Sequence, residues 1–206
     1  AGLGPFLGTG HIVFNLKDDL SQIESLYKYL RTQEHPFKYV VIDNVSEMEQ
    51  WLINILTITR GKDFPEPFLE HKDASYKMRE FLTLFRDLTY KGITVVFNAW
   101  EFPLEIRHLE GEIITKLFPK ISKKIAPEIC GKVDCVGHLE LYEKTGERYI
   151  RFEPTNWIEA KSQLKGLDRF EPADFKLILK KLYAYKYVKE DTDVSKKDNS
   201  NSTHRK

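Results

Sequence analysis

Two short apolar stretches decide how this chain folds: YVVID at residues 39–43 and ITVVFN at residues 93–98. Each is a continuous apolar run of strand length that closes on a polar side chain, Asp43 in the first and Asn98 in the second. Uninterrupted apolar runs are typical of strands buried on both faces, as in parallel sheets. The two stretches therefore predict neighbouring parallel strands of an α/β domain.

The segment between the two strands has the pattern of helices. Residues 46–59 and 73–90 carry apolar side chains at helical spacing, and Gly92 ends the second of these runs. Parallel strands need a crossover connection, which the order strand, helices, strand supplies. Before this unit, the pattern predicts a strand at residues 11–16 and a helix at residues 18–31.

The second half of the chain alternates more and is rich in short strand patterns. The turn around Gly146 between two such patterns predicts a β-hairpin. From Lys189 the chain is polar to its end, so we expect residues 189–206 to form a disordered tail and residues 1–188 a single domain. The pattern predicts strands at 113–118, 133–142, 148–152 and 158–162, a short helix at 121–129, and a helix from Pro172 to Val188.

Composition excludes several classes of protein. The 206 residues are 41% hydrophobic and carry 32 Lys and Arg against 31 Asp and Glu, so the chain is neither wholly disordered nor strongly charged. Two cysteines cannot frame a disulfide-rich secreted module. No apolar run reaches the 18 or so residues of a membrane span. We expect a cytoplasmic protein without a membrane partner.

Polar side chains follow both decisive strands. Asp43 and Asn44 end the first, and Asn98 and Glu101 follow the second. In open parallel sheets ligands bind beyond the carboxyl ends of the strands, where a carboxylate can hold Mg²⁺ and a neighbouring polar group can orient water. The pattern predicts a nucleotide site here. The alternative is that Asp43 caps the following helix, a role that can coexist with metal binding.

The loop that usually cradles the phosphates is missing from the sequence. No two of the 11 glycines have the spacing that G-x-x-x-x-G-K-[ST] requires. Either the fold is a different one, or the first strand, the phosphate loop and its helix lie upstream of Ala1. In the second case we expect apolar surface beside residues 39–43 to be uncovered.

Several segments, in order, resemble the phage nucleotide-binding ATPases with a RecA-like P-loop core that are linked to single-strand annealing and recombination. YVVIDNVSE at residues 39–47 is similar to their Walker B segment, and VVFNAWE at residues 95–101 to their "V-I-F-T-A-H-E" strand. DCVGHL at residues 134–139 resembles their "D-x-V-G" segment, and residues 148–163 resemble their "R-x-L … A-K-x-R" ending. The match covers roughly residues 1–168.

The resemblance implies a fold, a cofactor and site residues. The fold is a RecA-like core, a mostly parallel sheet with flanking helices, followed here by the β-hairpin region. ATP is bound with Mg²⁺ on Asp43, with Asn44 and Lys161 as further nucleotide contacts. Glu101, with Asn98, lies near the attacking water or the terminal phosphate. Contact of Lys161 with phosphate across a subunit boundary implies a homo-oligomer.

The chain departs from the family pattern at three places. It lacks the Walker A segment, which is expected to abolish tight ATP binding by the 206 residues alone. Trp100 stands where the family has His, and Trp cannot shuttle a proton. Gln163 stands where the family has Arg, and a neutral amide cannot supply a charged finger. The sequence therefore leaves open whether the parent protein is an active ATPase.

The leading hypothesis is the ATPase core of a phage recombination-type protein that acts with single-stranded DNA. The alternative is a non-catalytic DNA-binding or protein-interaction module on the same scaffold. Lysines and tyrosines interleave in residues 176–187, a pattern that suits single strands but is also that of an ordinary amphipathic helix, which we favour. Cys130, Cys135 and His138 have metal-like spacing, yet free thiols and a hydrogen-bonded imidazole are the preferred interpretation.

Overall fold

The computed structural model describes residues 20–61, 68–107 and 111–182. The chain divides into two compact units, Ala1–Trp100 and Glu101–Lys206, and each is described by itself. The strand predicted at residues 11–16, the polar tail at 189–206 and the tyrosines beyond residue 182 lie outside the described residues. That residues 1–188 form one domain stays a prediction.

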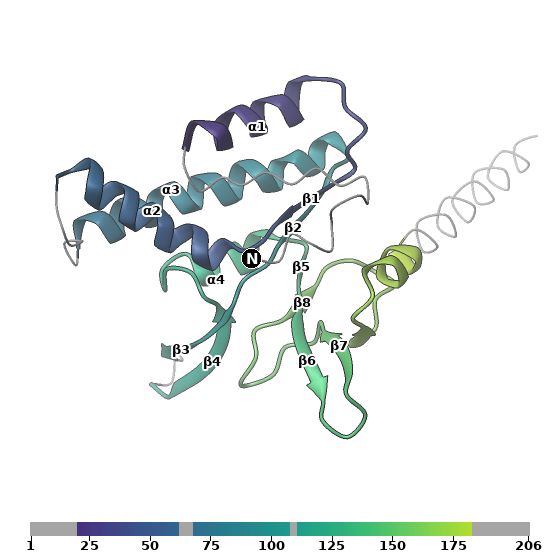
Figure 1. The fold of residues 1–206 in the computed structure, drawn as a ribbon. Helices are drawn as coiled ribbons and strands as arrows, with labels where there is room; N and C mark the ends of the chain where they lie inside the picture. The colour runs from purple at the N-terminus through teal and green to yellow at the C-terminus, as the bar shows by residue number, and fades with distance from the viewer. Residues whose placement is uncertain (1–19, 62–67, 108–110, 183–206) are drawn as a thin grey trace, which may run out of the picture. The chain divides into compact units, whose positions relative to one another are not determined.

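The first unit contains the predicted strand–helices–strand crossover (Figure 1). Strand β1 pairs with β2 in parallel, in a register that runs from Tyr39 opposite Thr94 to Ile42 opposite Phe97. The two decisive stretches of the sequence are therefore neighbours, as predicted. In chain order the elements are α1 (Leu20–Thr32), β1 (Tyr39–Ile42), α2 (Val45–Thr59), α3 (Leu69–Arg86), the 3-10 helix η2 (Asp87–Lys91) and β2 (Thr94–Phe97).

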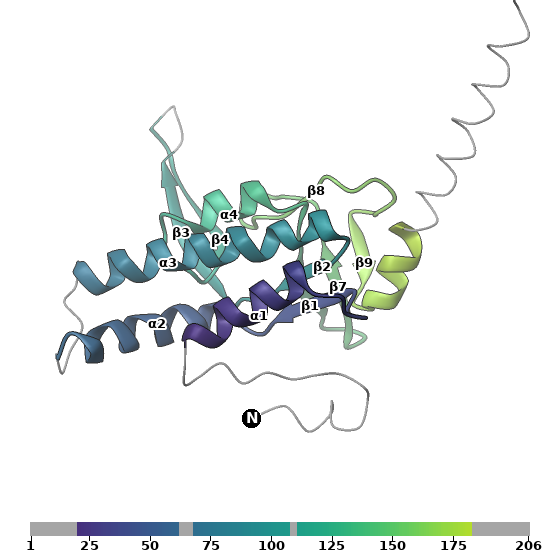
Figure 2. The ribbon, with the colours of Figure 1, turned by 90° about the horizontal axis from the view of Figure 1, so that it is seen from above.

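Helix α3 supplies more buried apolar residues to the core of this unit than any other described element, because its apolar side chains recur on one face. The rings of Phe81 and Phe85 are 4.5 Å apart, and Tyr27 of α1 approaches Phe85 at 5.7 Å. Figure 2 shows α2 and α3 side by side. Gly92 ends η2 with a φ of 76°, a left-handed conformation that favours glycine. The buried apolar residues of α3 are Ala74, Met78, Phe81, Leu82 and Phe85.

Strand β1 is less buried than its sequence predicts. Tyr39 is 40% and Val41 56% exposed, whereas Val40 and Ile42 are half-buried. Successive side chains of a strand point to opposite faces, so one face of β1 is open. The expectation of two buried faces is wrong for this strand, and the uncovered apolar surface beside residues 39–43 is present.

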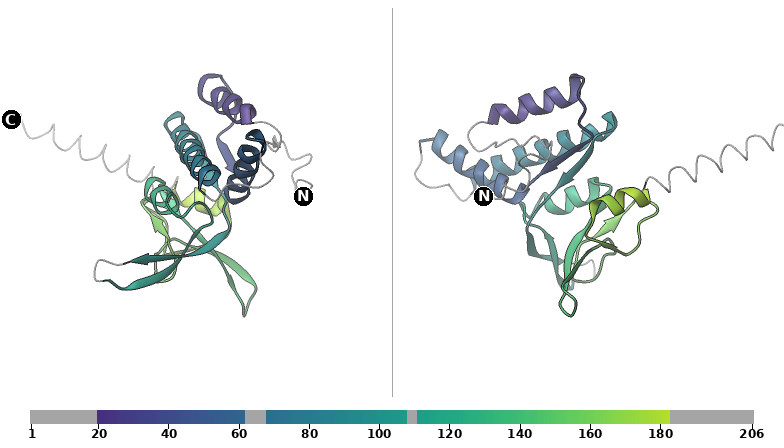
Figure 3. Two further views of the ribbon diagram at one scale, coloured as in Figure 1. Left: turned by 90° about the vertical axis from the view of Figure 1, so that its left-hand side faces the viewer. Right: turned by 45° about the vertical axis from the view of Figure 1, so that its right-hand side comes forward.

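The described residues of the second unit form short antiparallel sheets and two helices. The predicted hairpin is confirmed: β6 and β7 pair antiparallel around a turn in which Gly146 has a φ of 71°. In the left view of Figure 3 the β3–β4 and β6–β7 hairpins extend away from each other. The strands are β3 (Glu101–Arg107), β4 (Ile113–Pro119), β5 (Cys135–Val136), β6 (His138–Tyr142), β7 (Glu147–Arg151), β8 (Lys161–Ser162) and β9 (Phe170–Pro172), with helix α4 (Ala126–Lys132) and a helix at 175–182.

The pairing of these strands differs from the prediction in several places. Strand β3 begins at Glu101 and pairs with β4, although the sequence predicts no strand there. The strand predicted at 133–142 is interrupted at Gly137. Only β1 and β2 form a parallel ladder among the named strands of the described residues, so a mostly parallel RecA-like sheet stays a prediction.

The predicted role of Pro172 is wrong. Pro172 ends the edge strand β9, and the next helix begins at residue 175. Asp174 caps that helix, because its Oδ1 accepts hydrogen bonds from the amides of Lys176 at 2.9 Å and Leu177 at 3.2 Å. A carboxylate that takes up these free N–H groups is a stronger start signal than a proline two residues earlier.

We predict that Gly137→Ala destabilises the chain. A Cβ on Gly137 would lie 2.5 Å from Cγ2 of Ile150 in β7, so overpacking should lower the free energy of unfolding by roughly 1 to 3 kcal/mol. The matched control is Gly131→Ala in helix α4, where a Cβ meets nothing within 4 Å; it should gain about 0.5 to 1 kcal/mol. Urea denaturation measures both, and equal stabilities would contradict the close approach.

We also predict that Asn44→Ala weakens helix α2. Oδ1 of Asn44 accepts a hydrogen bond from the amide of Glu47 at 2.8 Å, which caps the helix. Loss of that acceptor should cost about 1 kcal/mol in unfolding free energy. Asn44→Asp keeps the acceptor and should unfold like the original chain. A stability of Asn44→Ala equal to that of Asn44→Asp in thermal unfolding would show that the cap contributes nothing.

Candidate functional site

The carboxyl ends of β1 and β2 bring two of the predicted site residues together. The amide of Asn98 donates to the carbonyl of Ile42 at 2.9 Å, and the amide of Val45 donates to the carbonyl of Asn98 at 2.8 Å. These bonds continue the parallel ladder past the last strand residues. As a result Nδ2 of Asn98 lies 3.4 Å from Oδ1 of Asp43. The adjacency of Asp43 and Asn98 is confirmed, while their chemical roles stay predictions.

Asp43 is not the cap of helix α2, because the residue that follows it has that role. Asn44 is the N-cap, so its side-chain oxygen is occupied by the amide of Glu47. Asp43 is exposed, and among the described residues its carboxylate contacts Asn98 alone. The alternative that Asp43 caps helix α2 is therefore wrong, and the carboxylate of Asp43 remains available to a cation. Mg²⁺ is typically held by one or two carboxylates together with water and substrate phosphates, so this donor fits it.

The segment after β2 is fixed to helix α2. The amide of Trp100 donates to Oγ of Ser46 at 3.0 Å, and Ser46 is buried. The side chain of Trp100 is 49% exposed. Its backbone thus has a defined place at the end of the first unit, although nothing in its indole supplies an acid or a base.

Glu101 lies at the start of the second unit, as the first residue of β3. Its Oε2 is 2.7 Å from Nε2 of His138, the first residue of β6. The preferred interpretation of His138 as a hydrogen-bonded imidazole is confirmed. Because Asp43 and Glu101 belong to different units, a shared site for these two carboxylates stays a prediction.

Further charged groups lie next to His138. Nδ1 of His138 is 3.4 Å from Oε1 of Glu140, and Glu140 is bound in turn by Arg151 through two nitrogens, Nε and Nη2, the latter at 3.2 Å. The hydrogen bond from Arg151 is the main reason that the pKa of Glu140 is lower than usual. Glu140 therefore remains ionised at neutral pH, held by Arg151 on one side with the imidazole on the other.

The sequence analysis did not predict that His138, Glu140, Tyr149 and Arg151 share a face, although the turn at Gly146 indicates it. The turn at Gly146 sets the hairpin register, which places His138 opposite Arg151 and Glu140 opposite Tyr149. Strand alternation then puts all four side chains on one face. The opposite face of β6 carries Leu139 and Leu141, which are 59% and 58% exposed. Strand β6 thus turns its ionisable residues inward and its leucines outward.

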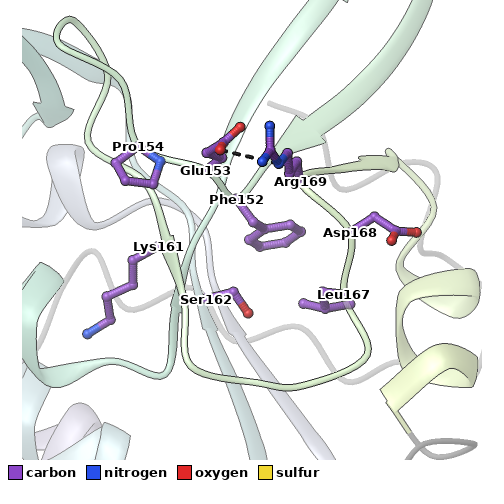
Figure 4. A pocket seen from close by; sticks show the side chains of 8 residues that line it. All are labelled: Phe152, Glu153, Pro154, Lys161, Ser162, Leu167, Asp168 and Arg169. Atoms are coloured by element: carbon purple, nitrogen blue, oxygen red, sulfur yellow. Dashed lines mark ion pairs between the residues drawn. The ribbon is translucent and has the colours of Figure 1, made fainter.

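Lys161 has a main-chain partner in this structure. Its Nζ donates to the carbonyl of Gly131 in helix α4 at 2.7 Å, and in Figure 4 the ammonium points away from Phe152 and Ser162. The backbone N–H of Gln163, the other residue of the family's ending, donates to the carbonyl of Asp134 at 2.9 Å. Contact of Lys161 with phosphate stays a prediction, and it requires this ammonium to change partners.

A shallow pocket of about 330 Å³ lies beside Lys161 (Figure 4). Three of its four charged side chains are in ion pairs, because Arg169 lies 3.3 Å from Glu153 and Asp168 lies 2.7 Å from Lys181. The fourth, Lys161, donates to the main-chain carbonyl of Gly131 instead. Its lining residues are Phe152, Glu153, Pro154, Lys161, Ser162, Leu167, Asp168 and Arg169.

The two cysteines are free thiols. Cys130 is buried, and desolvation raises its pKa to about 12, so it stays protonated at neutral pH. Sγ of Cys135 lies 3.5 Å from Oγ of Ser162. In residues 20–61, 68–107 and 111–182, no three or more His, Cys, Asp or Glu residues are grouped to hold a metal ion. Over the same residues, no helix combines the length and apolar character that crossing a membrane requires.

Comparison with known proteins gives one finding. A family model described as an AAA domain matches residues 9–164, a stretch that includes Asp43, Asn98, Glu101 and Lys161. No curated protein and no solved structure matches the chain significantly. The family match indicates nucleotide binding of the ATPase type, with ATP and usually Mg²⁺ as the ligands. Because the match spans more than half of the 206 residues, the chain belongs to the AAA domain family.

Proposed function

We propose that this chain is the ATP-binding core of a phage-type recombination protein that acts with single-stranded DNA. The observation that carries the nucleotide part is the pair of side chains Asp43 and Asn98 at the ends of two parallel strands, 3.4 Å apart, in a chain of the AAA domain family. The DNA and phage parts rest on the ordered motifs between residues 39 and 163 and on their resemblance to that group of ATPases.

Each residue of the proposed site has a defined task. Asp43 binds the cation. The side-chain amide of Asn98 orients the carboxylate of Asp43 by donating from Nδ2 to Oδ1. Bound Mg²⁺ neutralises charge on the phosphates during phosphoryl transfer. Glu101 accepts a proton from the attacking water or senses the terminal phosphate. Asn44 keeps the start of α2 in place beside Asp43, and Lys161 supplies a phosphate contact after leaving Gly131.

The proposed contact with single-stranded DNA depends on the helix at 175–182. The helix at 175–182 exposes Lys176 and Lys180, whereas Ile178 is buried. Lys181 is committed to Asp168 and Glu171, whose hydrogen bonds raise its pKa. Two exposed lysines on one short helix are compatible with phosphate contacts along a single strand. They are equally compatible with the solvated face of an amphipathic helix.

A second candidate function is a non-catalytic module that binds DNA or a protein on the same scaffold. Trp100 and Gln163 favour it, because neither can move a proton or carry a positive charge at the place where the family does so. The two candidates differ in what they bind. A nucleotidase binds ATP in a Mg²⁺-dependent manner, whereas the module binds DNA without nucleotide and loses affinity steeply with salt.

We predict that Asp43→Ala in the full-length gene product weakens Mg²⁺-dependent ATP binding about 10-fold or more, because the variant lacks the oxygen ligand. Glu24→Ala removes an exposed carboxylate from helix α1 of the same unit and should leave binding unchanged. Calorimetric titration with ATP, with and without Mg²⁺, measures the effect. Equal affinities for the original protein and Asp43→Ala would remove Asp43 from the site, and salt-sensitive DNA binding without any ATP binding would favour the second candidate.

A further inference from the structure

The contact between Glu101 and His138 joins two strands that are distant in the sequence. Glu101 opens β3 and His138 opens β6, and their side chains meet at 2.7 Å between Oε2 and Nε2. The carboxylate is 61% exposed, whereas the imidazole is only 19% exposed. A long, exposed glutamate normally samples many rotamers. Here a half-buried ring holds one of its oxygens.

The two ring nitrogens of His138 have different surroundings. Nε2 lies at hydrogen-bonding distance from Glu101, whereas Nδ1 is buried and has no hydrogen-bond partner among the described residues. Nδ1 is 3.4 Å from Oε1 of Glu140, but that approach is not aligned as a hydrogen bond. Because the ionised carboxylate of Glu101 can only accept a hydrogen bond, Nε2 carries a proton and donates it to Glu101.

On its Nδ1 side the imidazole faces Glu140, which is held in turn by side chains of β7 and β9. Arg151 of β7 holds Glu140 through two nitrogens, and its guanidinium lies 4.3 Å from the ring centre of Phe170 in β9. Tyr149 lies opposite Glu140 in the hairpin and packs edge-on against Phe170, with ring centres 5.4 Å apart. Together these contacts from β7 and β9 fix Glu140, so the ring of His138 faces a stationary negative group.

We propose that His138 is the positioning residue for Glu101. It donates Nε2–H to one carboxylate oxygen and thereby aims the other at the water or terminal phosphate of a nucleoside triphosphate. Glu140 and Arg151 keep the ring in the orientation that this donation needs. The inference rests on the proposed function for the role of Glu101, but the contact and the tautomer can be tested without turnover.

The first experiment reads the tautomer of the ring by nitrogen-15 NMR of the histidine side chains in the full-length gene product. We expect an Nε2-protonated ring for His138 with a proton protected from exchange, and loss of that protected proton in Glu101→Ala. Glu105→Ala is the matched control, because Glu105 is also an exposed carboxylate of β3. His35 is an internal reference: its Nε2 lies 2.9 Å from the carbonyl of Leu30, and it should not respond to either variant.

The second experiment uses ATP turnover with Mg²⁺. We expect His138→Leu to lower kcat about 10- to 100-fold with KM unchanged, because a residue that positions the reacting group affects the chemical step. His138→Gln keeps a side-chain N–H in a similar place and should recover most of the rate, which separates the lost hydrogen bond from a folding defect.

The outcomes separate this inference from the function on which it rests. Absence of ATP turnover in the original protein would count against the proposed function, and the ring NMR would then decide the positioning contact alone. An unchanged kcat in His138→Leu would overturn the inference. So would a His138 ring whose protected proton survives in Glu101→Ala.

Discussion

Everything inferred about nucleotide chemistry depends on the hydrogen-bonded junction beyond β1 and β2. The backbone N–H of Asn98 donates to the carbonyl of Ile42, and the backbone carbonyl of Asn98 accepts from the N–H of Val45. The segment that follows β2 is thereby joined to the segment that follows β1. These two bonds fix the backbone on either side of Asp43. They also determine that Asn98, rather than a residue one position away, reaches the carboxylate of Asp43. A shift by one residue would turn both side chains to the opposite face of the sheet.

The first unit was largely predictable, because its strands and helices carry strong local patterns. The apolar runs at 39–43 and 93–98 gave the parallel pair, and helical spacing gave α2 and α3 within a few residues. The exposure of Val41 was not readable from the run itself, since burial depends on what covers a strand. The sequence left open the alternative that Asp43 caps α2, because Asp and Asn are both good caps and only the geometry selects Asn44.

The second unit was harder to predict because its strands are short and paired over long distances. Strand β3 does alternate, with Phe102, Leu104 and Ile106 less exposed than their neighbours, but its Pro103 argues against a strand. Pairing with β4 along its whole length nevertheless forms one. The contact of Glu101 with His138 spans 37 positions, so no local pattern could reveal it. By contrast, the opposition of His138 and Arg151 follows from the turn at Gly146, and counting from that turn would have found it.

The two faces of strand β6 carry different kinds of side chain. One face carries His138 and Glu140, on which the aim of Glu101 is proposed to depend, and the other carries the exposed Leu139 and Leu141. Exposed leucines on a hairpin favour self-association at high concentration. Because successive residues of a strand point to opposite faces, polar substitutions at the two leucines can improve handling for crystallisation or spectroscopy while His138 and Glu140 on the reverse are left intact.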